Sequence, residues 1–310
     1  MTLIIVSHPE CLEHVTPSGH PERADRLKSI SKVLEYPIFK DAVQLSAPLA
    51  FDESIMLAHP SSYVQSIINA APDSGVTSLD PDTHMSPGSL NAARRAAGAN
   101  VMAVDHVMTG KARAAFCATR PPGHHAEKTS AMGFCLFANA SIAALHALAN
   151  HGVKRVAIAD FDVHHGNGTQ DVVWDDPRIC FCSSHQSPLY PGTGMEHETG
   201  AGNIHNATLP PMSGGAAFRA AWRDKLLPAI DAHKPDLIVI SAGFDAHADD
   251  PLANLNLVED DFAWITQELC DLANKHCDGR VVSTLEGGYS LSALSDSTAA
   301  HVKVLLEHSK

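Results

Sequence analysis

The sequence predicts a single α/β domain whose core is a parallel sheet covered by helices on both faces. Short β-branched, apolar runs alternate with longer helical patterns along almost the whole chain of 310 residues. Apolar residues make up 45% of the chain, which is enough for a large buried core. No low-complexity linker, charge block or internal repeat interrupts this pattern. We therefore expect one domain over residues 1–310.

The expected strands are short apolar runs, several of which end in polar clusters. Buried strands that alternate with helices favour parallel pairing, so we expect them to share one sheet. The predicted strands span residues 3–7, 114–119, 155–160, 179–184, 206–209, 236–243 and 280–288.

The expected helices carry the longer apolar periodicity of a single buried face. Ser86 is the expected N-cap of the second helix, with Pro87 at its first helical position. The predicted helices span residues 21–36, 87–108, 138–150, 216–232, 259–275 and 291–307.

The charge balance argues against a nucleic-acid-binding surface. The formal net charge is -13 at a sequence pI of about 5.8, and no Lys/Arg cluster is available to follow a phosphate backbone. An acidic surface is compatible with a cationic substrate and equally with an ordinary solvated exterior. The charge balance therefore argues against a nucleic-acid partner but does not favour any other class of partner.

Targeting signals and cysteine usage predict a soluble cytoplasmic protein. The N-terminal stretch "MTLIIVSHPE" has no basic segment and only four consecutive apolar residues, so we expect no signal peptide. No stretch approaches the ~20 apolar residues of a membrane span. The seven cysteines form no C-x-x-C pair, and we expect reduced core thiols. A homo-oligomer is compatible with the sequence.

Polar clusters follow four of the predicted strands at their carboxyl ends. Open parallel sheets bind their ligands beyond this edge, so equivalent positions on four strands predict one site. The side chains delivered to this rim are His124, His125, Asp160, Asp162, His164, Asp245 and Tyr289.

The stretch "DFDVHHGNG" contains the best candidates for metal ligands. Asp160, Asp162 and His164 are two residues apart, which places their side chains on one side of an extended chain. Carboxylates and an imidazole suit Zn²⁺, which at catalytic sites takes three protein ligands and a water. Asp245 in "SAGFDAH" is the best-placed carboxylate from another strand end.

The adjacent histidines His124 and His125 are candidates for proton transfer. Zinc-dependent hydrolysis of an amide needs a base for the water and an acid for the leaving amine. Asp160 is expected to orient one histidine and raise its basicity, and Asn167 to be the neutral partner of the other. Spacing alone also allows either histidine to be a fourth ligand. Tyr289 can donate a hydrogen bond to the developing oxyanion.

Six short motifs follow one another along nearly the entire chain. They read "RPPGHHA", "GFC", "DFDVHHGNGTQ", "SPLYPGTG", "SAGFDAH" and "LEGGY". Together and in this order they resemble the zinc-dependent histone deacetylase family, in particular its class II-like bacterial amidohydrolases. The resemblance implies the three-layer arginase/deacetylase fold, with an eight-stranded parallel sheet flanked by helices.

The resemblance also assigns roles at the rim. It implies that Asp162, His164 and Asp245 hold one zinc ion. It makes His125 the principal general base and His124 an electrostatic partner.

The remaining catalytic assignments also follow from the resemblance. Asp160 would lie behind His124, and Asn167 would lie behind His125, as in the class II branch. Tyr289 would polarise the scissile carbonyl together with the zinc.

An acyl-lysine tunnel is a further implication of the resemblance. Phe134 and Tyr190 match its two aromatic walls, although that second wall is frequently Phe in the family. Gly133 matches the residue whose carbonyl lies along the tunnel. The other substrate-binding positions are Asp82 at the rim, Leu252 at the mouth and Gly287.

The family carries structural monovalent cations, usually potassium, so we expect one or two K⁺. The first would be bound by oxygens of Asp160, Asp162, His164, Ser183 and Ser184. A second would be bound around Val173, Asp176 and Ile179.

The substrate is left open by these motifs. Leu252 stands near the position where polyamine-selective members carry a glutamate, which favours acetyl-lysine or a related acylated amine. Asp249 and Asp250 lie close by, so an acetylpolyamine or small-molecule amide remains the alternative. An arginase-like enzyme with two Mn²⁺ is disfavoured because Gly166 and Asn167 stand where further carboxylates are needed. A metal-bound acyl-ligand sensor is disfavoured by the intact catalytic set.

Overall fold

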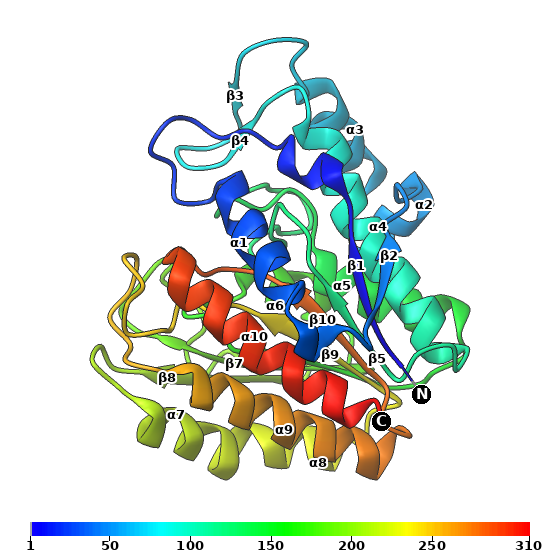
Figure 1. Cartoon of the computed structure of the whole chain (residues 1–310), viewed down its shortest axis with the longest axis vertical. Coiled ribbons are helices and arrows are strands. Elements are labelled where there is room, and N and C mark those ends of the chain that lie inside the picture. The colour runs from blue at the N-terminus through cyan, green and yellow to red at the C-terminus, as the bar shows by residue number, and fades with distance from the viewer. Residues whose placement is uncertain (1) are drawn as a thin grey trace.

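The computed structural model describes residues 2–310. These residues form one large sheet with helices packed around it (Figure 1). Every neighbouring pair of strands in this sheet is parallel. The predicted eight-stranded parallel sheet is therefore confirmed. In spatial order its strands are β2 (Val43–Ser46), β1 (Leu3–Ser7), β5 (Ala114–Cys117), β10 (Val281–Leu285), β9 (Leu237–Ala242), β6 (Val156–Asp160), β7 (Ile179–Gln186) and β8 (Ile204–Leu209).

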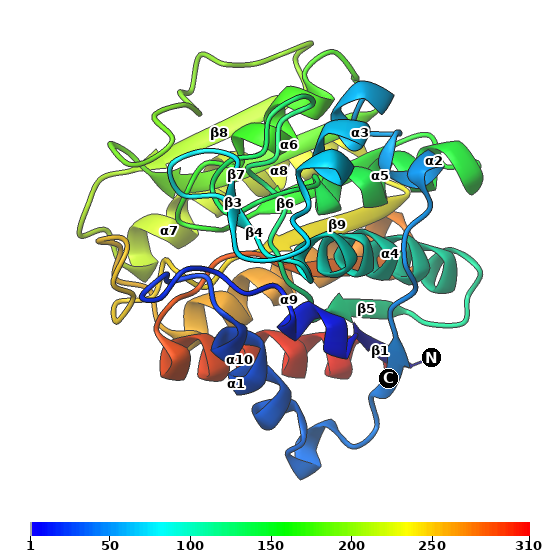
Figure 2. The same cartoon turned by 90° about the horizontal axis from the view of Figure 1, so that it is seen from above.

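Helices cover both faces of the sheet, as Figure 2 shows. One layer contains α4 (Ser89–Met108) and α5 (Asn139–Asn150). The opposite layer contains α1 (Ala24–Leu34), α8 (Leu227–His233), α9 (Glu259–His276) and α10 (Leu291–His308).

The alternation of side chains along each strand separates two hydrophobic cores. In β1, Leu3 and Ile5 pack with the α1, α9 and α10 layer, whereas Ile4 and Val6 pack with α4 and α5. Successive residues of a strand point to opposite faces, so a strand buried on both faces is apolar throughout. This is why these strands appear in the sequence as unbroken apolar runs.

The long segment between β2 and α4 lies near the carboxyl end of β1, at the top of Figure 1. It contains α2 (Asp52–Ile55), α3 (Ser61–Ala70) and the two-stranded pair β3 (Thr77–Ser78) and β4 (His84–Met85). None of these four elements was predicted. The short edge strand β2 and helix α6 (Asn167–Val173) were also missed.

Two sequence-based details are wrong. The second predicted helix begins at Ser89, with Gly88 as its N-cap, because the Ser86 hydroxyl instead accepts the Val15 N–H at 2.9 Å. The helix predicted over 216–232 is divided into α7 (Gly215–Ala221), a π-helical turn (Trp222–Leu226) and α8.

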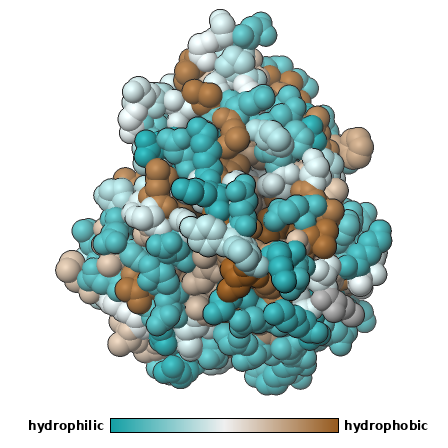
Figure 3. Space-filling view, in the orientation of Figure 1, coloured by the Kyte–Doolittle hydropathy of each residue, from teal (hydrophilic) through white to brown (hydrophobic). Residues whose placement is uncertain are grey.

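No helix in the described part of the chain is long and apolar enough to cross a membrane. The face seen in Figure 3 is largely hydrophilic, with apolar side chains in small groups. All seven cysteines are buried and free, as the sequence predicts.

Candidate active site

The four predicted strand ends are neighbours in the sheet. Strands β5, β10, β9 and β6 are consecutive in its spatial order, so the segments that follow them meet at one carboxyl edge. Parallel strands present these ends on the same side, which is why residues far apart in sequence share one site. The rim residues thus brought together are His124, His125, Asp160, Asp162, His164, Asp245 and Tyr289.

Asp162, His164 and Asp245 bring their ligand atoms to within 4.8 Å of one another. The Nδ1 atom of His164 lies 3.2 Å from an oxygen of Asp162 and 3.1 Å from an oxygen of Asp245. Both aspartates are completely buried or nearly so. Two carboxylates and one imidazole form the donor set that suits a divalent transition metal such as Zn²⁺.

The surroundings of these three residues are shaped to hold their carboxylates in place. The N–H of Gly287 donates to Asp162 at 2.8 Å, and the N–H of Val163 donates to Asp245 at 2.9 Å. A side chain on Gly243 or Gly287 would overlap the Asp162 carboxylate. Metal ligands are normally oriented by such neighbours, so the residues present fit a bound metal.

The charge of this group also fits a cation. Burial would lower the pKa of His164, but its hydrogen bonds to Asp162 and Asp245 raise it to about 10. The two carboxylates therefore favour a proton on the His164 imidazole. A divalent cation between these three ligands would neutralise the two buried carboxylates and displace that proton.

His124 contacts the aspartate that sequence reasoning placed behind it. Its Nδ1 lies 3.1 Å from Asp160, and its Nε2 lies 3.8 Å from Asp162. Burial disfavours the charged imidazole, but the carboxylates of Asp162 and Asp160 outweigh burial and raise the pKa of His124 well above its usual value. Asp162 and Asp160 therefore favour the protonated form of His124.

His125 has a neutral partner and the opposite protonation state. Its Nδ1 lies 2.7 Å from Oδ1 of Asn167. Burial and the neighbouring charges of His124 and His164 hold the pKa of His125 well below its usual value. A neutral imidazole with a partner at Nδ1 keeps its Nε2 lone pair available as a base.

Tyr289 is held by its backbone and not by its hydroxyl. Its N–H donates to Asp250 at 2.7 Å, and the guanidinium of Arg26 lies over its ring at 4.9 Å. Burial and the nearby Asp245 raise the pKa of the phenol well above its usual value. The hydroxyl therefore keeps its proton and remains a hydrogen-bond donor.

A cavity of about 240 Å³ leads from the surface to these residues. Phe134 and Tyr190 face it, and the Tyr190 ring lies 5.3 Å from that of His125. Gly133 has a φ of 56°, and a side chain there would overlap the ring of His125. The cavity is lined by Asp82, His125, Gly133, Phe134, His164, Leu189, Tyr190, Leu252 and Tyr289.

Known proteins are similar to this chain in both sequence and fold. The model of the histone deacetylase domain matches residues 20–305. A histone deacetylase-like amidohydrolase of Pseudomonas aeruginosa is 40% identical over 279 residues, which cover 88% of this chain and 73% of that protein. The crystal structure of the HDA15 HD domain matches with a TM-score of 0.93 at 34% identity, over 99% of this chain and 90% of that one.

The chain belongs to the histone deacetylase family. The predicted family and the arginase/deacetylase fold are both confirmed. The chloroplastic histone deacetylase 10 of Oryza sativa subsp. japonica is 46% identical over 219 residues, which cover 68% of this chain and 49% of that protein. The chain thus spans about half the length of that relative. Family membership supports a hydrolase of the deacetylase and amidohydrolase class, and the family is zinc-dependent in general.

In this deacetylase-family chain, the predicted substrate position Gly287 and the nearby acidic residue Asp250 do not line the cavity. Gly287 lies against the carboxylates of Asp162 and Asp245, two of the candidate metal ligands, and is not among the residues that line the cavity. Asp250 points inward, where one of its oxygens accepts the N–H of Leu252 at 3.0 Å and the other accepts that of Tyr289. Asp249 is exposed, so it is the acidic side chain of this pair that can reach solvent.

The residues expected to bind monovalent cations also form two groups. Asp160 and Ser183 are paired across β6 and β7, so the first predicted group is assembled beside the candidate zinc ligands. The carbonyl groups of Val173, Asp176 and Ile179 also converge, but they accept hydrogen bonds from the side chain of Asn203.

Three contacting residues were not predicted from the sequence. Glu127 accepts a hydrogen bond from the Asn167 amide at 2.7 Å. Glu286 accepts the N–H groups of Gly123 and His124 at 2.7 and 3.1 Å. The third, Leu189, lines the cavity. Glu286 and Leu189 lie within identified motifs and Glu127 directly follows one, so their positions beside predicted residues were the available signal.

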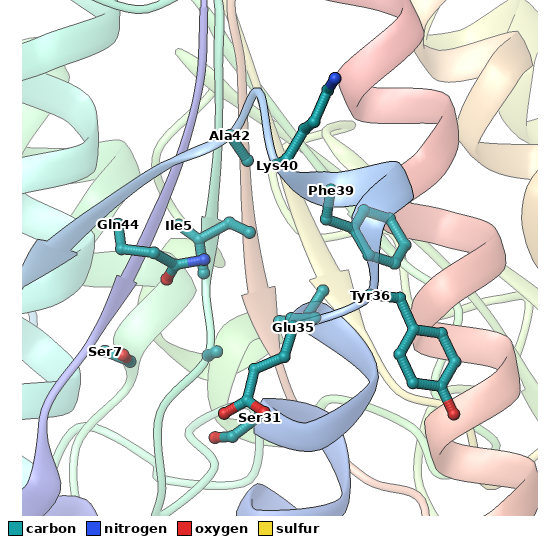
Figure 4. A pocket seen from close by; sticks show the side chains of 11 residues that line it. Ile5, Ser7, Ser31, Glu35, Tyr36, Phe39, Lys40, Ala42 and Gln44 are labelled. Atoms are coloured by element: carbon teal, nitrogen blue, oxygen red, sulfur yellow. The ribbon is translucent and has the colours of Figure 1, made fainter.

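A second cavity, of about 400 Å³, lies between β2 and α1 (Figure 4). Glu35, Lys40 and Gln44 line it together with Ile5 and Phe39, and Lys40 extends away from the other labelled side chains. It shares no lining residue with the cavity at the strand ends. The cavity of about 240 Å³ at the strand ends is therefore the one associated with the candidate active site.

Proposed function

We propose that this chain is a zinc-dependent deacetylase that releases acetate from acetyl-lysine or a related acylated amine. One observation carries the proposal. Asp162, His164 and Asp245 converge at the inner end of a narrow cavity, where His125 and Tyr289 also line the wall. Three ligands, a base and a hydroxyl donor are the groups that metal-assisted amide hydrolysis requires.

Asp162, His164 and Asp245 would hold the zinc ion. When bound there, zinc would lower the pKa of a water molecule and polarise the amide carbonyl. His125 is neutral and accepts the proton of the attacking water at Nε2. It is kept neutral by burial and by the positive charge of His124.

His124 and Tyr289 would stabilise the charge that develops during attack. His124 carries a positive charge maintained by Asp160 and Asp162. The Tyr289 hydroxyl donates a hydrogen bond to the oxyanion, as preorganised donors do at sites of acyl transfer. As the C–N bond breaks, the proton held by His125 passes to the nitrogen of the leaving amine.

The cavity favours an extended aliphatic acylamine. Its aromatic walls, Phe134 and Tyr190, suit the methylene chain of a lysine side chain, and Leu252 contributes an apolar mouth. Asp82 also lines the cavity and can accept hydrogen bonds from the substrate backbone. An acetylpolyamine is the alternative substrate, because Asp82 and Asp249 can also attract a cation.

Turnover and metal content together test this function. Purified protein should hydrolyse a fluorogenic acetyl-lysine amide, contain one zinc per chain and be inhibited by a hydroxamate chelator. Asp162→Ala and Asp245→Ala should lose both zinc and activity. Asp249→Ala is the matched control, since it removes an exposed carboxylate of the same loop and should keep both.

Two results would contradict the assignment. Full activity in Asp162→Ala or Asp245→Ala would remove these residues from the metal site. Binding of acyl ligands without turnover would favour a sensor instead of an enzyme. Comparing kcat/KM for acetyl-lysine peptides, longer acyl-lysines and acetylpolyamines would then identify the substrate class.

A further inference from the structure

The connection between α6 and β7 directs three backbone carbonyl oxygens at one atom. The oxygens of Val173, Asp176 and Ile179 lie 2.9, 3.1 and 2.8 Å from Nδ2 of Asn203. Val173 and Ile179 are fully buried, and Asn203 is only 5% exposed. A buried polar group in the segment before β8 thus fills the centre of a cage of oxygens.

These three residues are the ones that the family resemblance associates with a second monovalent cation. Potassium is bound in proteins by backbone carbonyl oxygens that replace its hydration shell. Such a cage must face an open centre, whereas here each oxygen is already within hydrogen-bonding distance of an amide nitrogen. The residues present therefore do not fit a cation at this position.

The orientation of the Asn203 amide is determined by its other contact. Its Oδ1 accepts the N–H of Ala201 at 3.0 Å. Turning the amide over would direct Oδ1 at the three carbonyls and leave the N–H of Ala201 facing an NH₂ group. The end directed at the cage is thus the donor, which has two hydrogens to share among three acceptors.

We propose that the Asn203 amide replaces the second monovalent cation in this chain. The partial positive charge of its NH₂ group stabilises the same three carbonyl dipoles that a cation would. Because this group is covalently attached, the α6–β7 connection keeps its structure without potassium. The chain then has at most one structural potassium site, the one expected beside β6 and β7.

Two substitutions should restore a requirement for the cation. Asn203→Ala removes the amide and leaves three buried carbonyls without a donor, which is costly unless an ion or water enters. Asn203→Asp keeps an oxygen for the Ala201 N–H but turns a second oxygen toward the cage. That oxygen is repelled by the carbonyls unless a cation binds between them.

The response of thermal stability to potassium tests the proposal. An ion that binds only the folded state raises Tm as its concentration increases. We expect both Asn203 variants to have a lower Tm than wild type in choline chloride. Their rise in Tm on transfer to KCl should be larger than that of wild type, and wild type should bind no more than one K⁺ per chain.

Asn206→Ala is the matched control. Asn206 is also a buried asparagine, but its Nδ2 donates to the side chain of Gln170 at 2.8 Å and to the single carbonyl of Met195 at 3.5 Å, and not to a cage of carbonyls. This variant should be destabilised with the same potassium response as wild type. Two K⁺ per wild-type chain, or a wild-type potassium response in both Asn203 variants, would overturn the proposal.

The readout is folding and ion content, so it does not depend on the proposed deacetylase function. If Asn203→Ala does not fold even in KCl, the isosteric Asn203→Asp and the wild-type ion content still decide the question.

Discussion

At the scale of single residues, two adjacent histidines acquire different protonation preferences from their neighbours. His124 faces Asp160 and Asp162, which favour its protonated form, whereas His125 faces the uncharged Asn167 and keeps a free lone pair. Two identical side chains separated by one peptide bond can thus supply a positive charge and a base. The environment of each histidine, rather than its residue type, determines whether it supplies the positive charge or the base.

The Tyr289 hydroxyl is the first residue-scale prediction. Tyr289→Phe should lower kcat by roughly 10²–10³, the scale of one oxyanion donor. Zinc content should not change, because Tyr289 is not among the candidate ligands. Steady-state kinetics with metal analysis measures both. Tyr190→Phe is the control, since it keeps the aromatic wall; near-normal turnover of Tyr289→Phe would remove that hydroxyl from the mechanism.

Glu127 is the second residue-scale prediction. It accepts the Asn167 NH₂ group, so the amide oxygen must face Nδ1 of His125, and this places the imidazole proton on Nδ1. Glu127→Ala should lower kcat about 10-fold to 100-fold, as loss of an orienting partner does, with little change in KM. Glu127→Gln retains an acceptor and should restore most of the activity.

A structural role alone would give a different result for Glu127. Loss of packing would affect Glu127→Ala and Glu127→Gln according to their stability and would not separate kcat from KM. Equal losses of kcat in the two variants would contradict the orienting role.

At the scale of elements, helix α4 packs closely against the segment that follows β2, and Gly98 of the helix lies at this contact. A side chain on Gly98 would overlap the carbonyl oxygen of Pro48 and crowd the N–H of Ala50. Helix propensity alone predicts that alanine stabilises a helix by about 1 kcal/mol relative to glycine. The contact with Pro48 reverses this expectation.

Gly98→Ala should therefore lower the thermal stability. Forced repacking of a tight contact costs about 1–3 kcal/mol, which exceeds the gain in propensity and should reduce Tm by about 2–4 °C. Differential scanning calorimetry measures the change. Asn91→Ala, at an exposed position of the same helix, should not lower Tm. A higher Tm for Gly98→Ala would show that the helix can move away from Pro48.

At the scale of the whole molecule, a buried carboxylate connects the N-terminal segment to the catalytic edge. Glu22 is 0% exposed and binds Arg120 at 2.6 Å and Arg26 at 3.0 Å. Arg120 begins the loop that carries His124, and Arg26 also donates to the carbonyls of Glu286 and Gly288. One carboxylate thus joins segments that are about a hundred residues or more apart in sequence.

Glu22→Gln should destabilise the protein by about 3–5 kcal/mol, because it leaves two buried guanidinium groups without their counter-charge. Urea unfolding followed by circular dichroism measures the loss. Glu53→Gln removes an exposed carboxylate and should change stability by no more than about 0.5 kcal/mol. An equal effect of the two substitutions would contradict this role.

The same contact predicts a pH dependence. Burial would raise the pKa of Glu22, but Arg120 and His14 outweigh it and hold its pKa well below the usual value. A carboxyl with a lowered pKa in the folded state contributes stability above its unfolded pKa of about 4.3 and loses it as pH falls further. Wild type should therefore lose more stability than Glu22→Gln as pH falls below about 4.

The sequence by itself determined the fold class, the order of most core elements and the set of rim residues. Apolar runs of strand length report burial on both faces, and polar residues directly after them report the carboxyl edge. Those signals are local, so they could be recognised without coordinates. The edge strand β2 and the helices α2 and α3 were missed because they bury fewer residues, so their apolar patterns in the sequence are weaker.

Spacing along the chain did not decide what each rim residue contacts, although the family resemblance paired Asp160 with His124 and Asn167 with His125. Spacing left either His124 or His125 available as a metal ligand, whereas the fold places Asp160 against His124 and Asn167 against His125. It also directed Asp250 inward and filled the cage of Val173, Asp176 and Ile179 with Asn203. These outcomes depend on the direction of side chains that meet from distant segments, and residue type and spacing along the chain do not contain that information.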